Sequence, residues 1–383
     1  MGKQIVILGA GFGGLAAANM LRKNLSSEHR IIVIDKKDWF MMGLVKLWIL
    51  DGSRILEESK TPLAGLNAKG IEYLNDEVVK INTAGRHVEA RGHGRIEYDY
   101  LIIALGAELV PDRIPGFVEN GLNLYDPAQV PIIREKLLAS SSNRRVAIAI
   151  MGMPYKCPPA PFEAAIIVSN ILAKAGASVE VNIYSPAPIA MPVAGPQVSA
   201  TVVETISQHG IRFNPSHKVK SVSASKLEFD NGNAIDYDLL IGVPPHRAPE
   251  VVRYSGLTAE GSDWVSVDRH TMRTAVKDVF AVGDVTEIKV GAVAVPKAGI
   301  FAEEEAKVVA QQIIDEIGML PEVRGAFSGQ GYCFMEVGGG RVGYLAADFY
   351  GSAGPLIKLE APSEEYFTKK QDFERTRVKE WLF

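Results

Sequence analysis

Short runs of continuous apolar residues mark the starts of two similar units along the chain. The run at 5–8 leads into a glycine-rich turn, a helical stretch and a second apolar run at 30–35. The run at 145–150 begins the same order again, with a helix at 162–175 and a strand at 178–184. Unbroken apolar runs of this length are typical of strands that are buried on both faces of a parallel sheet. The pattern therefore predicts two β-α-β units.

Later segments indicate that the first unit is interrupted. The apolar segments 98–106 and 278–284 and a long helix at 298–317 complete it, whereas the second unit closes near 238–245. We expect an α/β fold with two Rossmann-like dinucleotide-binding domains. Their predicted bounds are 1–112 with 250–325 for the first and 113–249 for the second, and the serine-rich segment 140–143 is a linker.

The last part of the chain has a different pattern. Strand-like segments at 331–337 and 341–346 flank three glycines, Gly338 to Gly340, which is a hairpin signal. The segment 364–383 has the composition of a helix. Residues 326–383 are therefore predicted to form a small β-hairpin and helix region.

Composition narrows the possible partners and location. The chain has 383 residues, 41 basic and 45 acidic side chains and a formal net charge of −4, so nucleic acid is an unexpected partner. No apolar run approaches the ~18 residues of a membrane-spanning helix. A strand pattern begins almost at the first residue, which leaves no room for a secretory signal and makes a cytoplasmic location the expectation. No histidine has metal-ligand spacing, and no metal is expected.

The first glycine motif indicates a dinucleotide. Gly9 permits a tight turn, Gly11 lets the backbone approach a pyrophosphate, and Gly14 allows close packing of helix and strand. Asp35, 21 positions later, is placed to accept from a ribose hydroxyl. Ala10 and Lys36 complete this part of the predicted binding set. The alternative is a glycine-rich turn that binds nothing.

Later residues favour FAD over NAD. A short strand ends at Gly283, and Asp284 is placed to accept from a sugar-alcohol hydroxyl. Lys297 precedes a helix whose dipole, with the ammonium, would stabilise negative charge on a reduced flavin. Alternatively, Asp284 is a helix cap and Lys297 is solvated. Together with Gly106 at the end of the strand at 98–106, these residues resemble the two-domain flavoproteins of the pyridine nucleotide–disulfide oxidoreductase superfamily.

The second unit lacks the glycine motif that most members of that superfamily use for NAD(P)H. Residues 151–163 read MGMPYKCPPAPFE, in which only Gly152 remains and four prolines enter the turn. Because proline has no N–H to donate to a phosphate, we expect a degraded NAD(P)H site. The loop instead carries one of the two cysteines, Cys157. A helix N-terminus and the adjacent Lys156 are expected to lower the pKa of this thiol, and Glu163 is a candidate proton acceptor or donor.

The second cysteine, Cys333, lies 176 positions further along the chain. Alternation along its strand places Cys333 and Phe334 on opposite faces. The number of cysteines alone is equally compatible with two inert buried thiols and with a catalytic or sensory pair.

A closer resemblance covers essentially the whole chain. The segments 155–163 (YKCPPAPFE), 244–249, 296–299 and 331–334 are similar to sulfide:quinone oxidoreductases and to the flavin subunit of flavocytochrome c sulfide dehydrogenase. This resemblance implies a redox disulfide between Cys157 and Cys333 beside the flavin, which hydrosulfide attacks. It further implies that Glu163 manages protons and that Lys297 holds the anionic reduced ring. Because methionines stand at 41 and 42, where flavocytochrome-type subunits attach the flavin through a cysteine, we expect non-covalent FAD. The third cysteine of many quinone-reducing members is missing.

The resemblance also implies a quinone acceptor at the membrane. Tyr332 and Phe334 are predicted to flank the quinone ring. The aromatic and apolar residues of the last helix, with a slight basic excess, are predicted to reach the lipid surface from the cytoplasmic side. These are Tyr366, Phe367, Phe373, Trp381, Leu382 and Phe383. The alternative is that they cover the flavin domain as core or form a contact in a homo-oligomer.

Three other functions remain open at this point. One is a soluble sulfide dehydrogenase that passes electrons to a cytochrome, although the chain has no haem-binding CxxCH. Another is a type II NADH:quinone oxidoreductase, which the lost second glycine motif disfavours. The third is a non-catalytic, flavin-bound sensor of sulfur or redox state.

Overall fold

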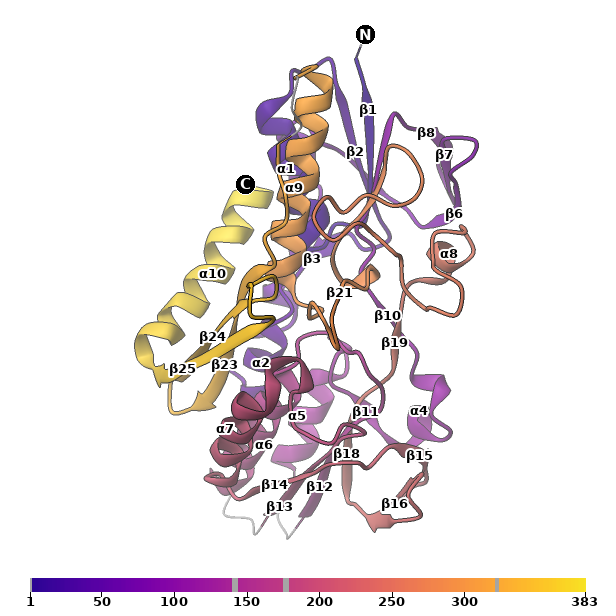
Figure 1. The fold of residues 1–383 in the computed structure, drawn as a ribbon. Coiled ribbons are helices and arrows are strands. Elements are labelled where there is room, and N and C mark those ends of the chain that lie inside the picture. The colour runs from indigo at the N-terminus through magenta and orange to yellow at the C-terminus, as the bar shows by residue number, and fades with distance from the viewer. Residues whose placement is uncertain (1, 140–143, 175–178, 321–323) are drawn as a thin grey trace.

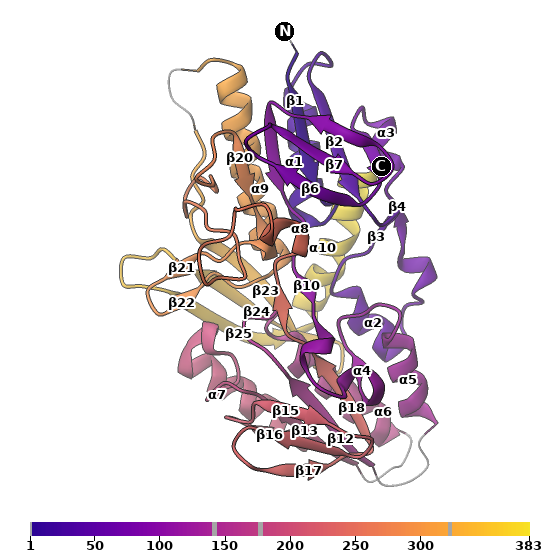
Figure 2. The ribbon, with the colours of Figure 1, turned by 90° about the vertical axis from the view of Figure 1, so that its right-hand side faces the viewer.

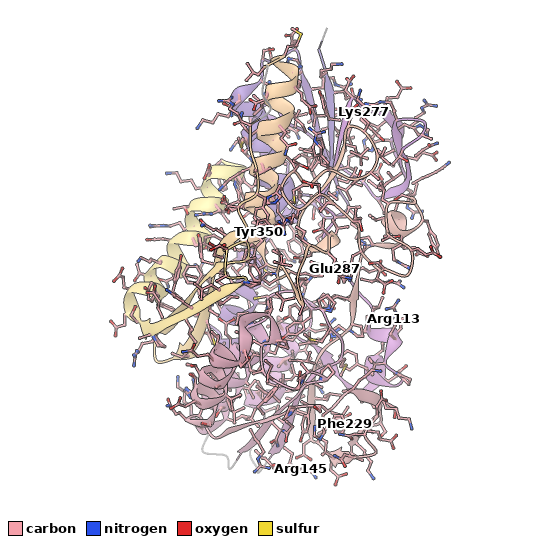
Figure 3. The ribbon with its side chains drawn as sticks, viewed as in Figure 1. Arg113, Arg145, Phe229, Lys277, Glu287 and Tyr350 are labelled. Atoms are coloured by element: carbon pink, nitrogen blue, oxygen red, sulfur yellow. The ribbon has the colours of Figure 1, made fainter. Side chains whose placement is uncertain are left out.

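Two five-stranded parallel sheets form the framework of the protein (Figure 1). The computed structural model describes residues 2–139, 144–174, 179–320 and 324–383. The sheets lie towards opposite ends of an elongated molecule: in Figure 3, Lys277 beside the first sheet and Arg145 in the second are far apart. The predicted α/β class with two Rossmann-like sheets is confirmed.

The first sheet is assembled from distant parts of the chain. Its strand order is β20-β9-β1-β2-β5. The strands are β1 (Gln4–Leu8), β2 (Arg30–Asp35), β5 (Glu72–Asn75), β9 (Tyr100–Ile103) and β20 (Val279–Ala281). Helices α1 (Phe12–Asn24) and α9 (Gly299–Ile317) pack against each other and against the core side chains of β1. Because β20 pairs with β9, the chain returns to this sheet after the second one is complete.

The second sheet has the strand order β11-β18-β12-β13-β14. Its strands are β11 (Leu122–Asn123), β12 (Arg144–Ile150), β13 (Val179–Tyr184), β14 (Ile211–Asn214) and β18 (Leu239–Val243). Alternate residues of β12 enter two cores, one with α5 (Val130–Leu138), α6 (Ala160–Lys174) and α7 (Gly195–Ser207), the other with a small antiparallel sheet (Figure 2). That sheet contains β15 (Val219–Val222), β16 (Lys226–Phe229) and β17 (Ala234–Asp236).

The C-terminal region is a three-stranded antiparallel sheet followed by a helix. The hairpin of β23 (Gln330–Gly338) and β24 (Arg341–Asp348) is confirmed, and Gly338 to Gly340 all have positive φ. A third strand, β25 (Leu356–Ser363), was not predicted; its apolar–polar alternation covers only residues 357–361, and none of its residues is fully buried. Helix α10 (Glu364–Leu382) begins at Ser363, whose hydroxyl accepts from the Tyr366 N–H, and runs beside α1.

Shorter elements connect these layers. The helices are α2 (Val45–Asp51), α3 (Gly65–Ala68), α4 (Phe117–Asn120) and α8 (Glu250–Arg253), with 3₁₀ turns at Glu57–Ser59, Pro111–Arg113, Pro192–Ala194 and Gly283–Val285. The strands are β3 (Trp39–Phe40), β4 (Thr61–Pro62), β6 (Val78–Asn82), β7 (His87–Ala90), β8 (Gly94–Glu97), β10 (Glu108–Leu109), β19 (His246–Arg247), β21 (Lys289–Val290) and β22 (Val293–Ala294).

Some predictions fall outside what the structure describes. These are the linker at 140–143 and the element ends at Ala175 and Ser178. The exact domain boundaries also stay a prediction. None of the helices in the described ranges combines the length and the apolar composition needed to cross a membrane.

Candidate active site

The turn between β1 and α1 forms a cradle for an anionic ligand. Gly9 has φ of +100°, and a Cβ at Gly14 would lie 1.8 Å from the Gly9 carbonyl oxygen, so the turn packs tightly on the helix. A Cβ at Gly11 would meet nothing within 4 Å, which leaves the backbone open to a ligand. No side chain caps the N-terminus of α1, so its first N–H groups are available to phosphate oxygens.

Asp35 holds this turn in place from the end of β2. Its Oδ2 accepts from the Ala10 N–H at 2.7 Å, and its Oδ1 accepts from the Lys37 N–H at 2.9 Å. Each carboxylate oxygen can accept a further hydrogen bond, so a ribose hydroxyl can still bind here. Lys36 is exposed beside it. The predicted group of Gly9, Ala10, Gly11, Gly14 and Asp35 therefore lies together.

A second part of the cradle comes from β9 and β20. Gly106 has positive φ with open space at its Cβ position, and Gly283 has positive φ close against α9. The Gly283 N–H donates to Oε2 of the buried Glu305 at 2.6 Å, and Asp284 follows it. These groups fit the sugar and pyrophosphate of FAD.

Lys297 is buried and already has partners. Its Nζ donates to the carbonyl oxygens of Asp284 at 2.8 Å and Thr286 at 2.7 Å, and lies 3.4 Å from the centroid of the Trp264 ring. Burial lowers the pKa of Lys297 to about 8. The ammonium therefore anchors the loop that carries Asp284. Its predicted action on a reduced flavin stays a prediction.

Cys157 is held in a strained backbone conformation. Its φ is +53°, a value that residues with a side chain adopt rarely. Its N–H donates to the Lys297 carbonyl at 2.7 Å, and its carbonyl accepts from the Ala160 N–H at 3.0 Å and the Tyr125 hydroxyl at 3.3 Å. Such strain persists where the surroundings fix it, and it is frequent at active sites.

The two cysteines meet. The Cys333 side chain on β23 lies close enough to act on the Cys157 thiol, and both are free thiols. Phe334 packs instead against Phe373 of α10, with ring centroids 6.0 Å apart. The loop that carries Cys157 also joins the cradle through its hydrogen bond to Lys297.

The predicted low pKa of the Cys157 thiol is wrong for this state. The neighbouring Cys333 side chain and burial raise the pKa of the Cys157 thiol well above its ordinary value, and the charge of Glu163 adds to this effect. Lys156 lies nearby, but the helix N-terminus and this lysine do not outweigh those effects. In the reduced protein, the Cys157 thiol therefore stays protonated.

The position of the second glycine motif offers no phosphate site. The Ala160 N–H donates to the Cys157 carbonyl, and the Phe162 and Glu163 N–H groups donate to the Pro159 carbonyl. Pro161 has no N–H. The start of α6 therefore has its backbone donors occupied, in contrast to α1.

Comparison with known proteins agrees with this geometry. The pyridine nucleotide-disulphide oxidoreductase family model matches residues 3–312. The chain belongs to this family. The predicted resemblance to sulfide:quinone oxidoreductases is also confirmed, by the relatives that follow.

The similar proteins include enzymes from bacteria and animals. The sulfide-quinone reductase of Aquifex aeolicus (strain VF5) is 28% identical over 341 residues, which cover 84% of this chain and 78% of that protein. The mitochondrial sulfide:quinone oxidoreductase of Mus musculus is 24% identical over 316 residues, covering 78% and 69%. The X-ray structure of the sulfide:quinone oxidoreductase from Aquifex aeolicus has a TM-score of 0.87 and 25% identity, covering 98% of this chain and 90% of that chain.

On the other side of β23, this family member has an aromatic cluster next to a cavity. Tyr332 contacts Phe334, Tyr344 and Phe373, with ring centroids 5.4 to 5.9 Å apart. Tyr332 also lines a cavity of about 480 Å³, together with Ile300 of α9 and Leu356 of β25. Phe334 is buried in the cluster and does not line the cavity.

Two groups of site residues were missed by the sequence analysis. Tyr125 donates to the Lys156 carbonyl at 2.7 Å as well as to Cys157, yet no motif marks it. Lys370 of α10 binds Glu163 and Glu336 in the core. Its spacing of three residues from Phe373 places it on a buried helix face, and that was the available signal.

Proposed function

We propose that the chain is an FAD-dependent sulfide:quinone oxidoreductase that oxidises hydrosulfide at a Cys157–Cys333 disulfide. The observation that carries the proposal is that Cys157 and Cys333, 176 positions apart in the sequence, lie close together. The loop that carries Cys157 is also hydrogen-bonded to the dinucleotide cradle. The similarity to enzymes with this name supports it. Inert thiols would not require the strained backbone at Cys157.

The proposed chemistry is thiol–disulfide exchange. Hydrosulfide attacks one sulfur of the disulfide, forming a new S–S bond as the Cys157–Cys333 bond breaks, and leaves a persulfide and a thiolate. FAD, when bound, supplies the two-electron acceptor for the sulfur centre and the donor for the quinone. Glu163, whose charge acts on Cys157, accepts or releases the proton; burial raises the pKa of Glu163, which makes its carboxylate a better proton acceptor than an exposed one.

We further propose that FAD is held without a covalent bond. The cradle supplies Gly11, the free start of α1, Asp35 and Asp284. Met41 and Met42 stand where a covalent attachment would need a cysteine. Acid precipitation of the purified protein should release all yellow colour into the supernatant. Colour that stays with the precipitate would contradict this.

The quinone is proposed to approach the flavin through the cavity lined by Tyr332. The cavity has a volume typical of small-molecule sites; Ile300, Ala346 and Leu356 contribute apolar surface, and Glu304, Asp348 and Lys358 contribute charged surface. Phe373 contacts both Tyr332 and Phe12, the first residue of α1, so the aromatic cluster connects the cavity to the cradle. Peripheral contact with the cytoplasmic surface of a membrane, through the C-terminal region, belongs to the same proposal.

Anaerobic mixing of the flavin-loaded protein with sulfide and, separately, with NADH tests the electron donor. We expect sulfide to bleach the flavin and NADH to leave it oxidised, because the backbone donors at the start of α6 are occupied. Bleaching by NADH alone would favour a type II NADH:quinone oxidoreductase.

The acceptor is tested by turnover. Sulfide-dependent reduction of decylubiquinone is expected. Reduction of a cytochrome but not of decylubiquinone would favour a sulfide dehydrogenase. Bleaching by sulfide without turnover on either acceptor would favour a flavin-bound sensor.

A further inference from the structure

A buried cluster of charged groups joins four elements of the protein. Lys370 of α10 places its Nζ 3.0 Å from Oε1 of Glu163 on α6 and 2.8 Å from Oε1 of Glu336 on β23. The Glu336 N–H donates to the same Glu163 oxygen at 2.9 Å, and Trp48 Nε1 of α2 donates to Glu336 at 2.7 Å. The side chains of Lys370 and Glu163 are 2% and 1% exposed.

The cluster depends on its single cation. Two carboxylates and one ammonium lie where water is largely excluded, and removing one partner of a buried ion pair leaves the other uncompensated. Burial alone would lower the pKa of Lys370, but the charges of Glu163 and Glu336 raise it above its ordinary value. The ammonium therefore stays charged. Lys370 is the only cation within ion-pair distance of either carboxylate among the described residues.

Each carboxylate lies a few residues along the chain from one of the two cysteines. Glu163 follows Cys157 by six residues, across the loop and the first turn of α6, and Glu336 follows Cys333 by three residues on β23. Lys370 is bonded to both carboxylates. Its charge and that of Glu163 also act on the Cys157 thiol. The distance between the two sulfur atoms thus depends on elements that this lysine ties together.

We propose that Lys370 is a positioning residue. It holds α6, which follows the Cys157 loop, against β23, which carries Cys333, and so keeps the two sulfur atoms close enough to form a disulfide. The inference rests on the proposed redox role of the pair but assigns a new residue to it. Without the ammonium, the two carboxylates repel each other and α6 and β23 separate. The effective concentration of one thiol at the other then falls, which disfavours the disulfide relative to the two thiols.

The reduction potential of the cysteine pair tests this directly. The flavin-loaded protein is equilibrated in buffers of reduced and oxidised dithiothreitol, which exchange two electrons and two protons with the pair, and the free thiols are then alkylated and counted. In Lys370→Met, the equilibrium between the disulfide and the two thiols should shift at least tenfold towards the thiols. This shift corresponds to a reduction potential less negative by about 30 mV. Lys370→Arg should recover at least half of that shift because it keeps the charge. Lys369→Met is the matched control, since Lys369 is exposed and pairs with the exposed Glu365, and it should leave the potential unchanged.

If Lys370 only stabilised the fold, Lys370→Met would have a lower melting temperature but an unchanged reduction potential of the cysteine pair. That result overturns the proposal. If Lys370→Met does not fold, Glu336→Gln takes its place, because the amide still accepts from Trp48 but no longer attracts the ammonium as a charge. A potential unchanged in Glu336→Gln also overturns it. Failure of sulfide to bleach the wild-type flavin would count against the proposed function alone, since the thiol couple is measured without sulfide.

Discussion

At the residue scale, the geometry of the Cys157 loop depends on a few hydrogen bonds to distant side chains and carbonyls. The Tyr125 hydroxyl bridges the carbonyls of Lys156 and Cys157, and the Cys157 N–H is bonded to Lys297. These contacts hold a cysteine at positive φ, with its sulfur facing Cys333. The position of the reactive sulfur is therefore a property of several elements and not of the loop alone.

Replacing Tyr125 with Phe tests this dependence. The variant should lose about 1 kcal/mol of stability, because the part-buried Lys156 carbonyl loses the Tyr125 donor. Sulfide should reduce its flavin about tenfold more slowly, because the sulfur is less well placed. Stopped-flow bleaching and chemical denaturation measure the two effects. Tyr254→Phe, at a side chain that is 78% exposed, is the control. Equal bleaching rates in the two variants would contradict the role of the hydroxyl.

The sequence predicts which residues lie together where a motif is local. Gly9, Gly11, Gly14 and Asp35 form one cradle because a strand, a turn and a helix fix their spacing. The cluster around Lys370 joins residues up to 322 positions apart, from Trp48 to Lys370, and no local pattern encodes such contacts. The thiol pKa was wrong for a related reason: burial and the partner thiol come from the tertiary fold, whereas the adjacent lysine is visible in the sequence.

At the element scale, the start of α1 decides whether the cradle can form. Gly14→Ala should abolish most FAD binding, because its Cβ would lie 1.8 Å from the Gly9 carbonyl oxygen and must displace the turn. The ratio of FAD to protein after purification measures this. Gly43→Ala is a suitable control, since its nearest neighbour, Lys46 Nζ, is 3.7 Å from the added Cβ. Full FAD content in Gly14→Ala would contradict the assignment.

Elements with strong periodicity were predictable. The strand at 30–35 and the helices at 298–317 and 364–383 agree with the structure to within about one residue. The edge strand β25 was missed although residues 357–361 alternate between apolar and polar, because this alternation is short and none of the strand's residues is fully buried. The pattern of apolar and polar residues reflects burial more than it reflects the intrinsic propensity of the residues for helix or strand.

At the scale of the whole molecule, a buried acid makes stability depend on pH. Glu305 of α9 faces the Gly283 turn, and burial raises its pKa to about 8, above the ~4.3 of an unfolded chain. The folded state binds this proton more tightly, so the stability it contributes is present in full below pH ~4 and is lost as the pH rises through 8.

Glu305→Gln should therefore remove this dependence. The stability of the variant relative to wild type should increase from pH 5 to pH 9 by roughly 1 kcal/mol or more, since each pKa unit corresponds to about 1.4 kcal/mol. Thermal unfolding at both pH values measures it. Glu304→Gln, on the same helix and exposed, should show no such change. If the stability difference between Glu305→Gln and wild type is the same at pH 5 and pH 9, the assignment is refuted.

The central claim is that Cys157 and Cys333 carry the electrons from sulfide to the flavin. Anaerobic titration of wild type, Cys157→Ser and Cys333→Ser with sulfide, followed by flavin absorbance, tests it most directly. We predict bleaching of wild type alone, with dithionite bleaching all three proteins as evidence of intact flavin. Full bleaching of both serine variants by sulfide would contradict the account.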